Sequence, residues 1–194
     1  LMQHRNKKEG FEFLSPDIAL ELFKDIGDGF FQSRYDCESD DLVLQPIPYV
    51  LVFGPNGRVF SYVRAENIDD YGDSRLFGKH SIGLGGHINK GDGPNYVESC
   101  LEREVTKEEV EIFGGYTKPK LAGTLMAYDK PVDRVHFGLI FVTKTNGDVR
   151  VRESSIISGR MVSIDELMRD TNCKERYETW SNALIPHLVE LSKY

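Results

Sequence analysis

An alternating pattern of apolar and polar residues predicts β-strands through the middle of the chain. The stretch "IPYVLVFGPNGRVFSYVR", residues 47–64, contains two runs rich in β-branched and aromatic residues, separated by "GPNG". Two such runs on either side of a glycine-containing turn predict a β-hairpin. Similar runs predict strands over residues 81–88, 118–128, 133–145 and 149–153, and a short strand before residue 163.

Helical spacing and capping residues predict helices at both ends of the chain. In "LSPDIALELFKDIGDG", Ser15 is a typical N-cap, Pro16 suits the first helical position and Gly27 ends the helix. A short helix is predicted after Ser163, with acidic residues in its first turn. The final 17 residues predict an amphipathic helix, kinked near Pro186 because proline removes a backbone hydrogen bond.

A further helix is predicted over residues 93–112, where Val97, Leu101 and Val105 recur at intervals of four. The order of elements is then helix, strands, one helix, strands and helices. This order indicates a mixed α/β (α+β) fold without the regular alternation of a doubly wound sheet. At 194 residues, the chain suits one good-sized domain.

The polar stretch "QSRYDCESDD" after the first helix predicts a linker or an exposed loop. We therefore place the domain boundary near Pro46. Residues 1–45 are predicted to form a helical arm and linker, and residues 46–194 the main domain with the C-terminal helices.

The formal net charge of −7 offers no general basic field for nucleic acid or an anionic membrane. A ligand that carries phosphate would therefore need a local source of positive charge, such as bound divalent cations. The three cysteines, Cys37, Cys100 and Cys173, lie far apart and form no CxxC pair, which suits a reducing compartment. The sequence also has no run of about 18 apolar residues. We expect a cytoplasmic protein that binds neither nucleic acid nor membrane.

Glu104 and Glu108 lie four residues apart on the predicted central helix, so their carboxylates share one face. Glu111 extends the acidic row by another turn. Carboxylates at this spacing repel each other unless solvent, a basic side chain or a metal ion compensates, and hard oxygen donors suit magnesium or manganese. The alternative is a solvated acidic face balanced by Arg103 and Lys107.

Gly83, Gly85 and Gly86 lie at the end of a predicted strand just upstream of this helix. Glycine allows a ligand or neighbouring segment to approach the backbone closely. A β-bulge or a tight turn would explain the same residues. Cys100 and His136 are predicted to be packing residues, on the helix and in the middle of a strand respectively.

Together, these residues resemble the box motif of the Nudix hydrolase superfamily, whose members include MutT-like proteins. That motif is a glycine, five residues, a glutamate, seven residues and then REUxEExGU, with U an apolar residue. Gly86 matches the opening glycine, Arg103, Glu104 and Val105 match REU, and Glu108 matches the second acid of the EE pair. The strand order and "SIDEL" extend the resemblance from about residue 47 to residue 168.

The chain departs from the motif at three places. Asp92 stands for the first glutamate, and the segment from Gly86 to Arg103 is three residues longer than usual. Lys107 replaces the first acid of the EE pair. Val110 and Glu111 replace the closing glycine and apolar residue. "GGHIN" with a lengthened loop is similar to a subgroup of Nudix-like phosphoesterases.

The resemblance implies an α/β/α sandwich with a mixed sheet, and a pyrophosphohydrolase that acts on a nucleoside diphosphate linked to another moiety. It implies Mg²⁺ or Mn²⁺ held by Glu104 and Glu108, with Arg103 orienting Glu104 as part of the catalytic site. The predicted contacts of the small-molecule diphosphate are Gly85, Gly86 and His87. A lone histidine at a strand end is alternatively structural or exposed.

The resemblance leaves the general base unassigned and a homodimer open. The alternative function is a non-catalytic Nudix-like module that binds a nucleotide or metabolite, and Lys107 is its best support. An isopentenyl diphosphate isomerase shares the fold, but it needs a reactive cysteine and a glutamate in contexts that this sequence lacks.

Overall fold

The structure is a computed structural model that describes residues 2–3, 8–64, 76–108, 110–152, 156–170 and 172–194. In these residues the strands are β1 (Met2–Gln3), β2 (Gly10–Phe13), β3 (Val43–Gly54), β4 (Arg58–Arg64), β5 (His80–Ser81), β6 (Gly83–Gly85), β7 (Val110–Ile112), β8 (Lys120–Met126), β9 (His136–Lys144), β10 (Val149–Val151) and β11 (Ile156–Ser163). The helices are α1 (Pro16–Gly27), α2 (Arg34–Glu38), α3 (Tyr96–Glu102), α4 (Pro131–Arg134), α5 (Ile164–Arg169), α6 (Cys173–Arg176), α7 (Thr179–Leu184) and α8 (Leu188–Leu191). Shorter helical segments are the 3₁₀ turns η2 (Lys90–Asp92) and η4 (Ile185–His187) and the π-helix η3 (Arg103–Glu108).

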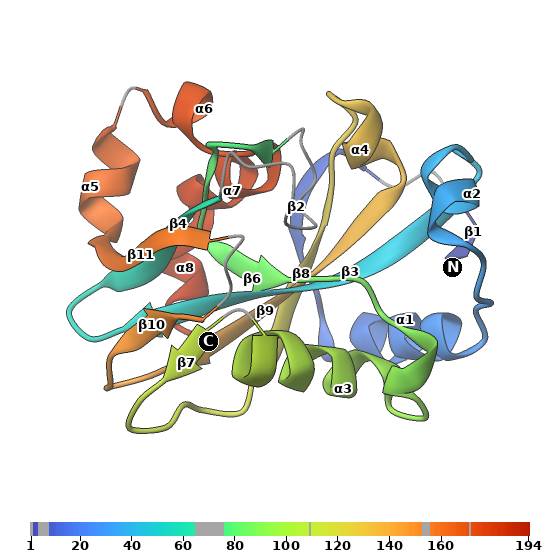
Figure 1. Ribbon diagram of the computed structural model, residues 1–194, viewed down its shortest axis with the longest axis horizontal. Coiled ribbons are helices and arrows are strands. Elements are labelled where there is room, and N and C mark those ends of the chain that lie inside the picture. Colours follow the sequence, from blue (N-terminus) through green and yellow to red (C-terminus); the bar gives the residue numbers. More distant parts are fainter. Residues whose placement is uncertain (1, 4–7, 65–75, 109, 153–155, 171) are drawn as a thin grey trace.

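Nine of the described strands form one mixed sheet with the central order β11-β4-β3-β9-β8-β2 (Figure 1). The long strands β3 and β9 run parallel, with Gln45 opposite His136 at one end of the register. Every other pair in the sheet is antiparallel, and β6 pairs with β3. Strands β7 and β10 form a separate two-stranded ribbon.

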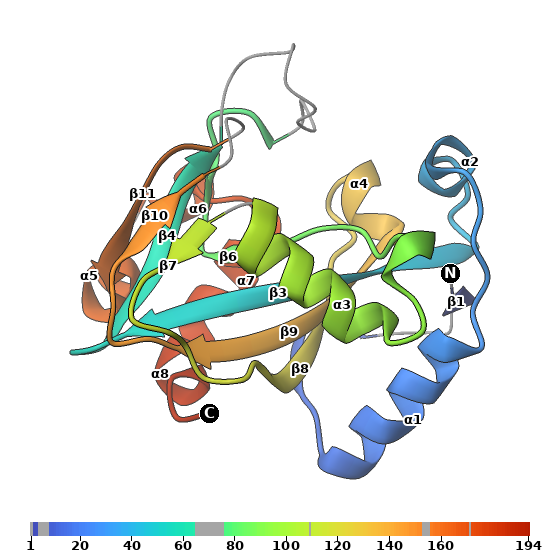
Figure 2. The ribbon, with the colours of Figure 1, turned by 60° about the horizontal axis from the view of Figure 1, so that its bottom comes forward.

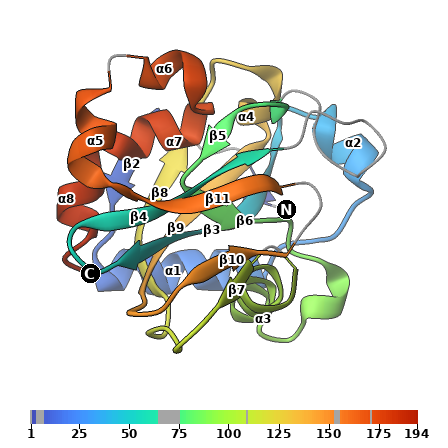
Figure 3. The same cartoon turned by 60° about the vertical axis from the view of Figure 1, so that its left-hand side comes forward.

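Helices cover both faces of the sheet, which gives the α/β/α sandwich that the resemblance implied. Side chains of β3 alternate between two apolar cores because successive residues of a strand point to opposite faces. Tyr49 and Leu51 belong to the core under α5, α7 and α8, whereas Val50 and Val52 belong to the core under α1 and α3. Figures 2 and 3 show these two helical layers from different sides.

Several predicted elements are confirmed. The hairpin is β3 and β4, joined through Asn56 and Gly57, both of which have positive φ. Helix α1 begins at Pro16, and the Ser15 side chain accepts a hydrogen bond from the Ile18 amide at 3.5 Å. The C-terminal helix is interrupted by η4, which contains Pro186. The polar stretch "RAENIDDYGDSRLFGKH", residues 64–80, predicts a loop, and most of it lies outside the described residues.

Other predictions were wrong in detail. The stretch predicted as a linker contains α2, which Ser33 caps through its side chain, and β3 begins at Val43. The predicted boundary near Pro46 stays a prediction, although β3 runs continuously through it. The segment of residues 10–13, for which no strand was predicted, is β2 and pairs with β8. In the described residues, no helix is long and apolar enough to span a membrane.

Candidate functional site

Gly86 lies directly against the carboxylate of Glu104. A Cβ atom at Gly86 would stand 2.6 Å from the Glu104 carboxyl carbon, closer than real Cβ atoms approach other atoms. At Gly85, a Cβ would collide with the Pro48 carbonyl oxygen of the neighbouring strand. The two glycines therefore allow a bare backbone to pass between β3 and the helix, and this close approach is why the sequence places glycine there.

Arg103 connects the loop after β6 with the helix. Its Nε and Nη2 donate to the two carboxylate oxygens of Asp92, both at 3.0 Å, and its Nη1 donates to Oε1 of Glu104. Nη2 also donates to the His87 carbonyl at 2.9 Å. A planar guanidinium suits this task because its donors diverge in a rigid fork. The contact between Arg103 and Glu104 is the one that the resemblance implied.

Asp92 is buried, with 7% of its surface exposed, yet it is held in the ionised form. Burial alone would raise its pKa, but the hydrogen bonds from Arg103 and from the Asn89 amide, at 2.7 Å, outweigh burial and lower the pKa. The hydrogen bond to Asp92 likewise raises the pKa of Arg103 further above its ordinary value. Asp92 and Arg103 therefore form an ion pair at neutral pH.

The central helix is not uniform. It is α-helical only as far as Glu102 and continues as a π-helix, η3, over the residues that match REUxEE. Short π-helical segments occur frequently at functional sites. The side chains of Lys107 and Glu108 lie outside the described residues, so the pairing of Glu104 with Glu108 stays a prediction.

The prediction that Glu111 extends the acidic helical row was wrong. The helix ends at Glu108, and Glu111 lies on β7, where it forms an ion pair of 3.1 Å with Arg152. Pairing of β7 with β10 replaced the expected last turn of the helix. The packing face predicted from the spacing of Val97, Leu101 and Val105 is confirmed, since all three are buried. Cys100 is also buried, as predicted.

The donor atoms around Gly86 fit a hard divalent cation. Glu104 is a largely buried carboxylate, 7% exposed, beside the half-buried backbone of Gly85 and Gly86. Arg103 holds Oε1 of this carboxylate. Magnesium and manganese prefer such oxygen donors and commonly share their remaining coordination positions with water and substrate phosphates.

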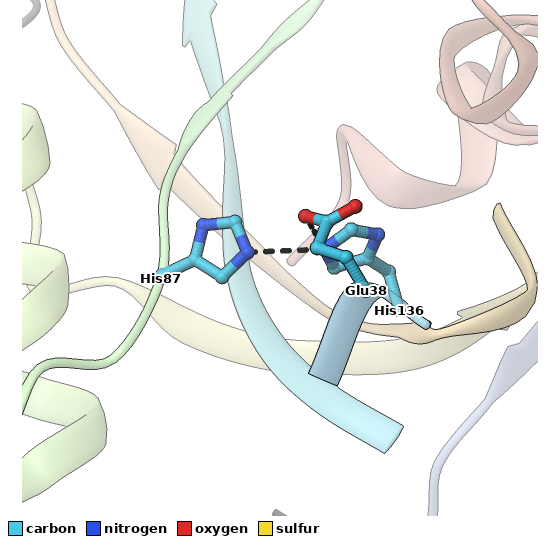
Figure 4. A group of neighbouring side chains, drawn as sticks. All are labelled: Glu38, His87 and His136. Atoms are coloured by element: carbon cyan, nitrogen blue, oxygen red, sulfur yellow. Dashed lines mark hydrogen bonds and ion pairs between the residues drawn. The ribbon is translucent and has the colours of Figure 1, made fainter. Parts of the chain in front are cut away.

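His87 also belongs to a second group of polar residues, together with His136 and Glu38. Its Nε2 lies 3.0 Å from Nε2 of His136, and His136 Nε2 lies 3.9 Å from Oε1 of Glu38 (Figure 4). His136 is buried as predicted, but it stands at the start of β9 rather than in its middle, and it faces polar groups. Glu38 is not predicted as a site residue, because the polar composition of its segment predicts a linker. Glu38, His87 and His136 are so far apart in the sequence that no spacing pattern could have predicted their meeting.

A cavity of about 600 Å³ adjoins His87. It lies between the segment that links α1 to α2 and the loop from His87 to Lys90. Aromatic residues of both sides meet there, since the rings of Phe31 and Tyr96 are 5.3 Å apart. Cavities of this size are typical of small-molecule sites.

The comparisons with known proteins agree with this geometry. No family model matches the chain. YmaB of Bacillus subtilis is 32% identical over 158 residues, which cover 78% of this chain and 74% of YmaB. The crystal structure of Tm1382, a proposed Nudix hydrolase, is 26% identical, covers 97% of this chain and 91% of its own, and has a TM-score of 0.74.

The Nudix domain of Shewanella oneidensis NrtR, solved with ADP ribose, shares the fold with a TM-score of 0.54 at 9% identity, over 93% of this chain and 97% of its own. Tm1382 matches almost the whole chain, and the contact of Arg103 with Glu104 is the one that the resemblance implied. The chain belongs to the Nudix hydrolase superfamily.

Proposed function

We propose that this protein hydrolyses the diphosphate of a nucleoside diphosphate linked to another moiety, with Mg²⁺ or Mn²⁺ held by Glu104 and Glu108. The contact between Gly86 and Glu104, with Arg103 bound to the same carboxylate, carries this proposal. It gives a buried acid a fixed orientation beside bare backbone. A carboxylate fixed in this way could hold a divalent cation, and the cation would stabilise the negative charge that develops on the phosphate oxygens.

Each residue has a defined task in this proposal. Gly86 allows the Glu104 carboxylate to lie against the backbone, and Gly85, Gly86 and His87 contact the diphosphate. Arg103 is a positioning residue, because its hydrogen bonds go to Asp92, Glu104 and the His87 carbonyl. When bound, the cation would neutralise phosphate oxygens and activate water for attack on phosphorus.

The substrate class follows from charge and from a structural relative. With a net charge of −7, the chain favours a small diphosphate neutralised by cations over a long polyanion. The NrtR domain was solved with ADP ribose, which is a nucleoside diphosphate linked to a second moiety. A homodimer remains a prediction.

Binding without hydrolysis is the second candidate function. Lys107 stands where the motif has an acid, and the helix ends at Glu108, after which Val110 enters β7. The helix therefore stops before the end of the motif. A domain that has lost a carboxylate here could still bind a nucleotide.

The test is turnover by the purified chain with Mg²⁺ or Mn²⁺ across a panel of nucleoside diphosphate sugars, dinucleotides and nucleoside triphosphates. Product nucleotides are measured by chromatography. We expect turnover of at least one compound. Glu104→Gln and Glu108→Gln should each lower turnover by about 100-fold or more, because removal of a group that only supports a metal ligand already causes losses approaching this size.

Glu98→Gln is the matched control, because Glu98 is an exposed acid on the same helix. It should leave turnover unchanged. Binding of a panel member without turnover would favour the non-catalytic candidate. Full activity in Glu104→Gln would refute the proposed role of the Gly86–Glu104 contact.

A further inference from the structure

Three segments that are distant in sequence bring metal-ligating side chains to one point. Glu38 ends α2, His87 follows β6, and His136 begins β9. One ligand atom of each, Oε1 of Glu38 and the Nε2 atoms of both histidines, all lie within 4.8 Å of one another. Figure 4 shows the histidine rings edge-on to each other, with the Glu38 carboxylate above His136.

The distances are close to those of ligands on one ion. Two nitrogens that each lie 2.0–2.1 Å from a metal, at angles of 90–109°, are about 2.8–3.4 Å apart. The two Nε2 atoms are 3.0 Å apart, with the rings at 72°. Oε1 of Glu38 is 3.9 Å from His136 Nε2, so a small side-chain rotation would complete the set.

The protein holds both histidines in place through their neighbours. His136 is 7% exposed, it pairs with Gln45 across β3 and β9, and Gln45 Nε2 lies 3.5 Å from His136 Nε2. The carbonyl of His87 accepts from Arg103. The Arg103 contact fixes the backbone at His87, whereas the Gln45 amide approaches the proposed ligand nitrogen itself and would turn away from it when an ion binds.

Glu38 comes from the N-terminal segment and is the more adjustable ligand. Its side chain is 20% exposed, and Oε1 also accepts from Arg34 Nε at 3.4 Å. The Arg34–Glu38 ion pair joins residues four apart on a short helix, and Arg34 is mostly exposed. The pair therefore competes only weakly with a metal ion for the Glu38 carboxylate. The adjacent Cys37 is 2% exposed, which ties this end of α2 to the body of the domain.

We propose that Glu38, His87 and His136 form a site for a first-row transition-metal dication such as Zn²⁺, separate from the carboxylates of the Nudix motif. Two imidazole nitrogens and one carboxylate suit Zn²⁺, Co²⁺, Ni²⁺ or Fe²⁺, whereas Mg²⁺ prefers oxygen donors. Three protein ligands leave at least one coordination position for water or a ligand. The site does not depend on the proposed hydrolysis.

The cavity provides a route to this site. His87 lines it, together with Cys37 and Gln45, the neighbours of the other two ligands. Because Glu38 lies on α2 while the histidines lie on the domain, an ion would also link the N-terminal segment to the sheet. An ion that binds only the folded state raises its stability by mass action.

The test is a titration of the full chain with Co²⁺ in excess Mg²⁺, which occupies oxygen-donor sites. Binding is monitored by visible absorption and by calorimetry. We expect one Co²⁺ per chain with d–d bands and no thiolate charge-transfer band. Zn²⁺ should displace Co²⁺ and raise Tm. Glu38→Gln and His87→Asn should each weaken Co²⁺ binding by at least about 10-fold.

Two variants serve as controls. His187→Asn alters a histidine that packs on Phe11 and Phe13, away from the cluster, and Glu104→Gln alters the Nudix carboxylate. Both should bind Co²⁺ as the unmodified chain does. If Glu38→Gln and His87→Asn, shown by circular dichroism to be folded, bind Co²⁺ normally, the proposal is wrong. A thiolate band, or no binding in excess Mg²⁺, would also overturn it.

Discussion

Two adjacent residues, Gly86 and His87, belong to two polar groups that were assembled in different ways. Gly86 lies against Glu104, and Arg103 links this acid to Asp92, all within 19 positions of the chain. His87 meets Glu38 and His136, which are about 50 positions away in each direction. The first group is local and charged. The second is assembled by the fold and has a contact between two histidine nitrogens at its centre.

The two groups also differ in how their charges and ligand atoms are balanced. In the first group, one guanidinium contacts two largely buried carboxylates, so the group keeps a net negative charge that suits the proposed cation. In the second group, two imidazole nitrogens and a carboxylate converge on one point, an arrangement that a cation would stabilise. Four predictions follow, beginning with the largest expected effect.

Arg103→Met should destabilise the protein strongly, because it leaves two carboxylates, 8% and 10% exposed, without their counter-charge. Breaking a buried pair in this way costs about 3–5 kcal/mol. His136→Asn should cost less, about 0.5–1.5 kcal/mol, the usual contribution of one hydrogen bond. Urea unfolding measures both free energies.

Arg160→Met is the control for the loss of an arginine, since the ion pair of Arg160 with Glu166 is mostly exposed. It should change the free energy of unfolding by about 0–1 kcal/mol. Equal costs for Arg103→Met and Arg160→Met would mean that the first group is not a compensated buried cluster.

Gly86→Ala should impair function more than stability. The added methyl group would meet the end of the Glu104 side chain, which can move aside, but the carboxylate would then lose its position. We expect turnover, or Mn²⁺ affinity measured by calorimetry, to fall by about 10–100-fold. Gly91→Ala is the matched control, because nothing lies within 4 Å of its Cβ position. If both variants behave alike, close approach at Gly86 has no functional importance.

The smallest effect concerns pH. The folded pKa of Asp92 lies below its unfolded value of about 3.9, so its contribution to stability is fully present above that value. The contribution is lost as the pH falls through the folded pKa. The stability difference between the unmodified chain and Asp92→Asn should therefore shrink on acidification, as measured by urea unfolding between neutral pH and about pH 3.

Asp133 provides the opposite case. Burial raises its pKa, so its contribution is greatest below the unfolded pKa and is lost as the pH rises through the folded pKa. Asp133→Asn should accordingly become relatively more stable than the unmodified chain as the pH rises. The same direction of change in both variants would contradict the assigned role of Arg103.

Much of the fold could be predicted because its signals are local. The hairpin of β3 and β4, the cap of α1 at Ser15 and the break at Pro186 depend on residues next to one another. Predictions failed where tertiary pairing overrode local pattern. Residues 110–112 continue a helical spacing but pair with β10, and residues 10–13 pair with β8.

The sequence by itself determined the Nudix motif, the glycine pair and the acid Glu104, because these residues lie on one strand, one loop and one helix in fixed order. It also determined that Arg103 is within reach of Glu104. Tertiary structure alone decided that Glu38 and His136 meet His87. That meeting depends on the parallel pairing of β3 with β9 and on the path of the N-terminal segment, which no local pattern of residues encodes.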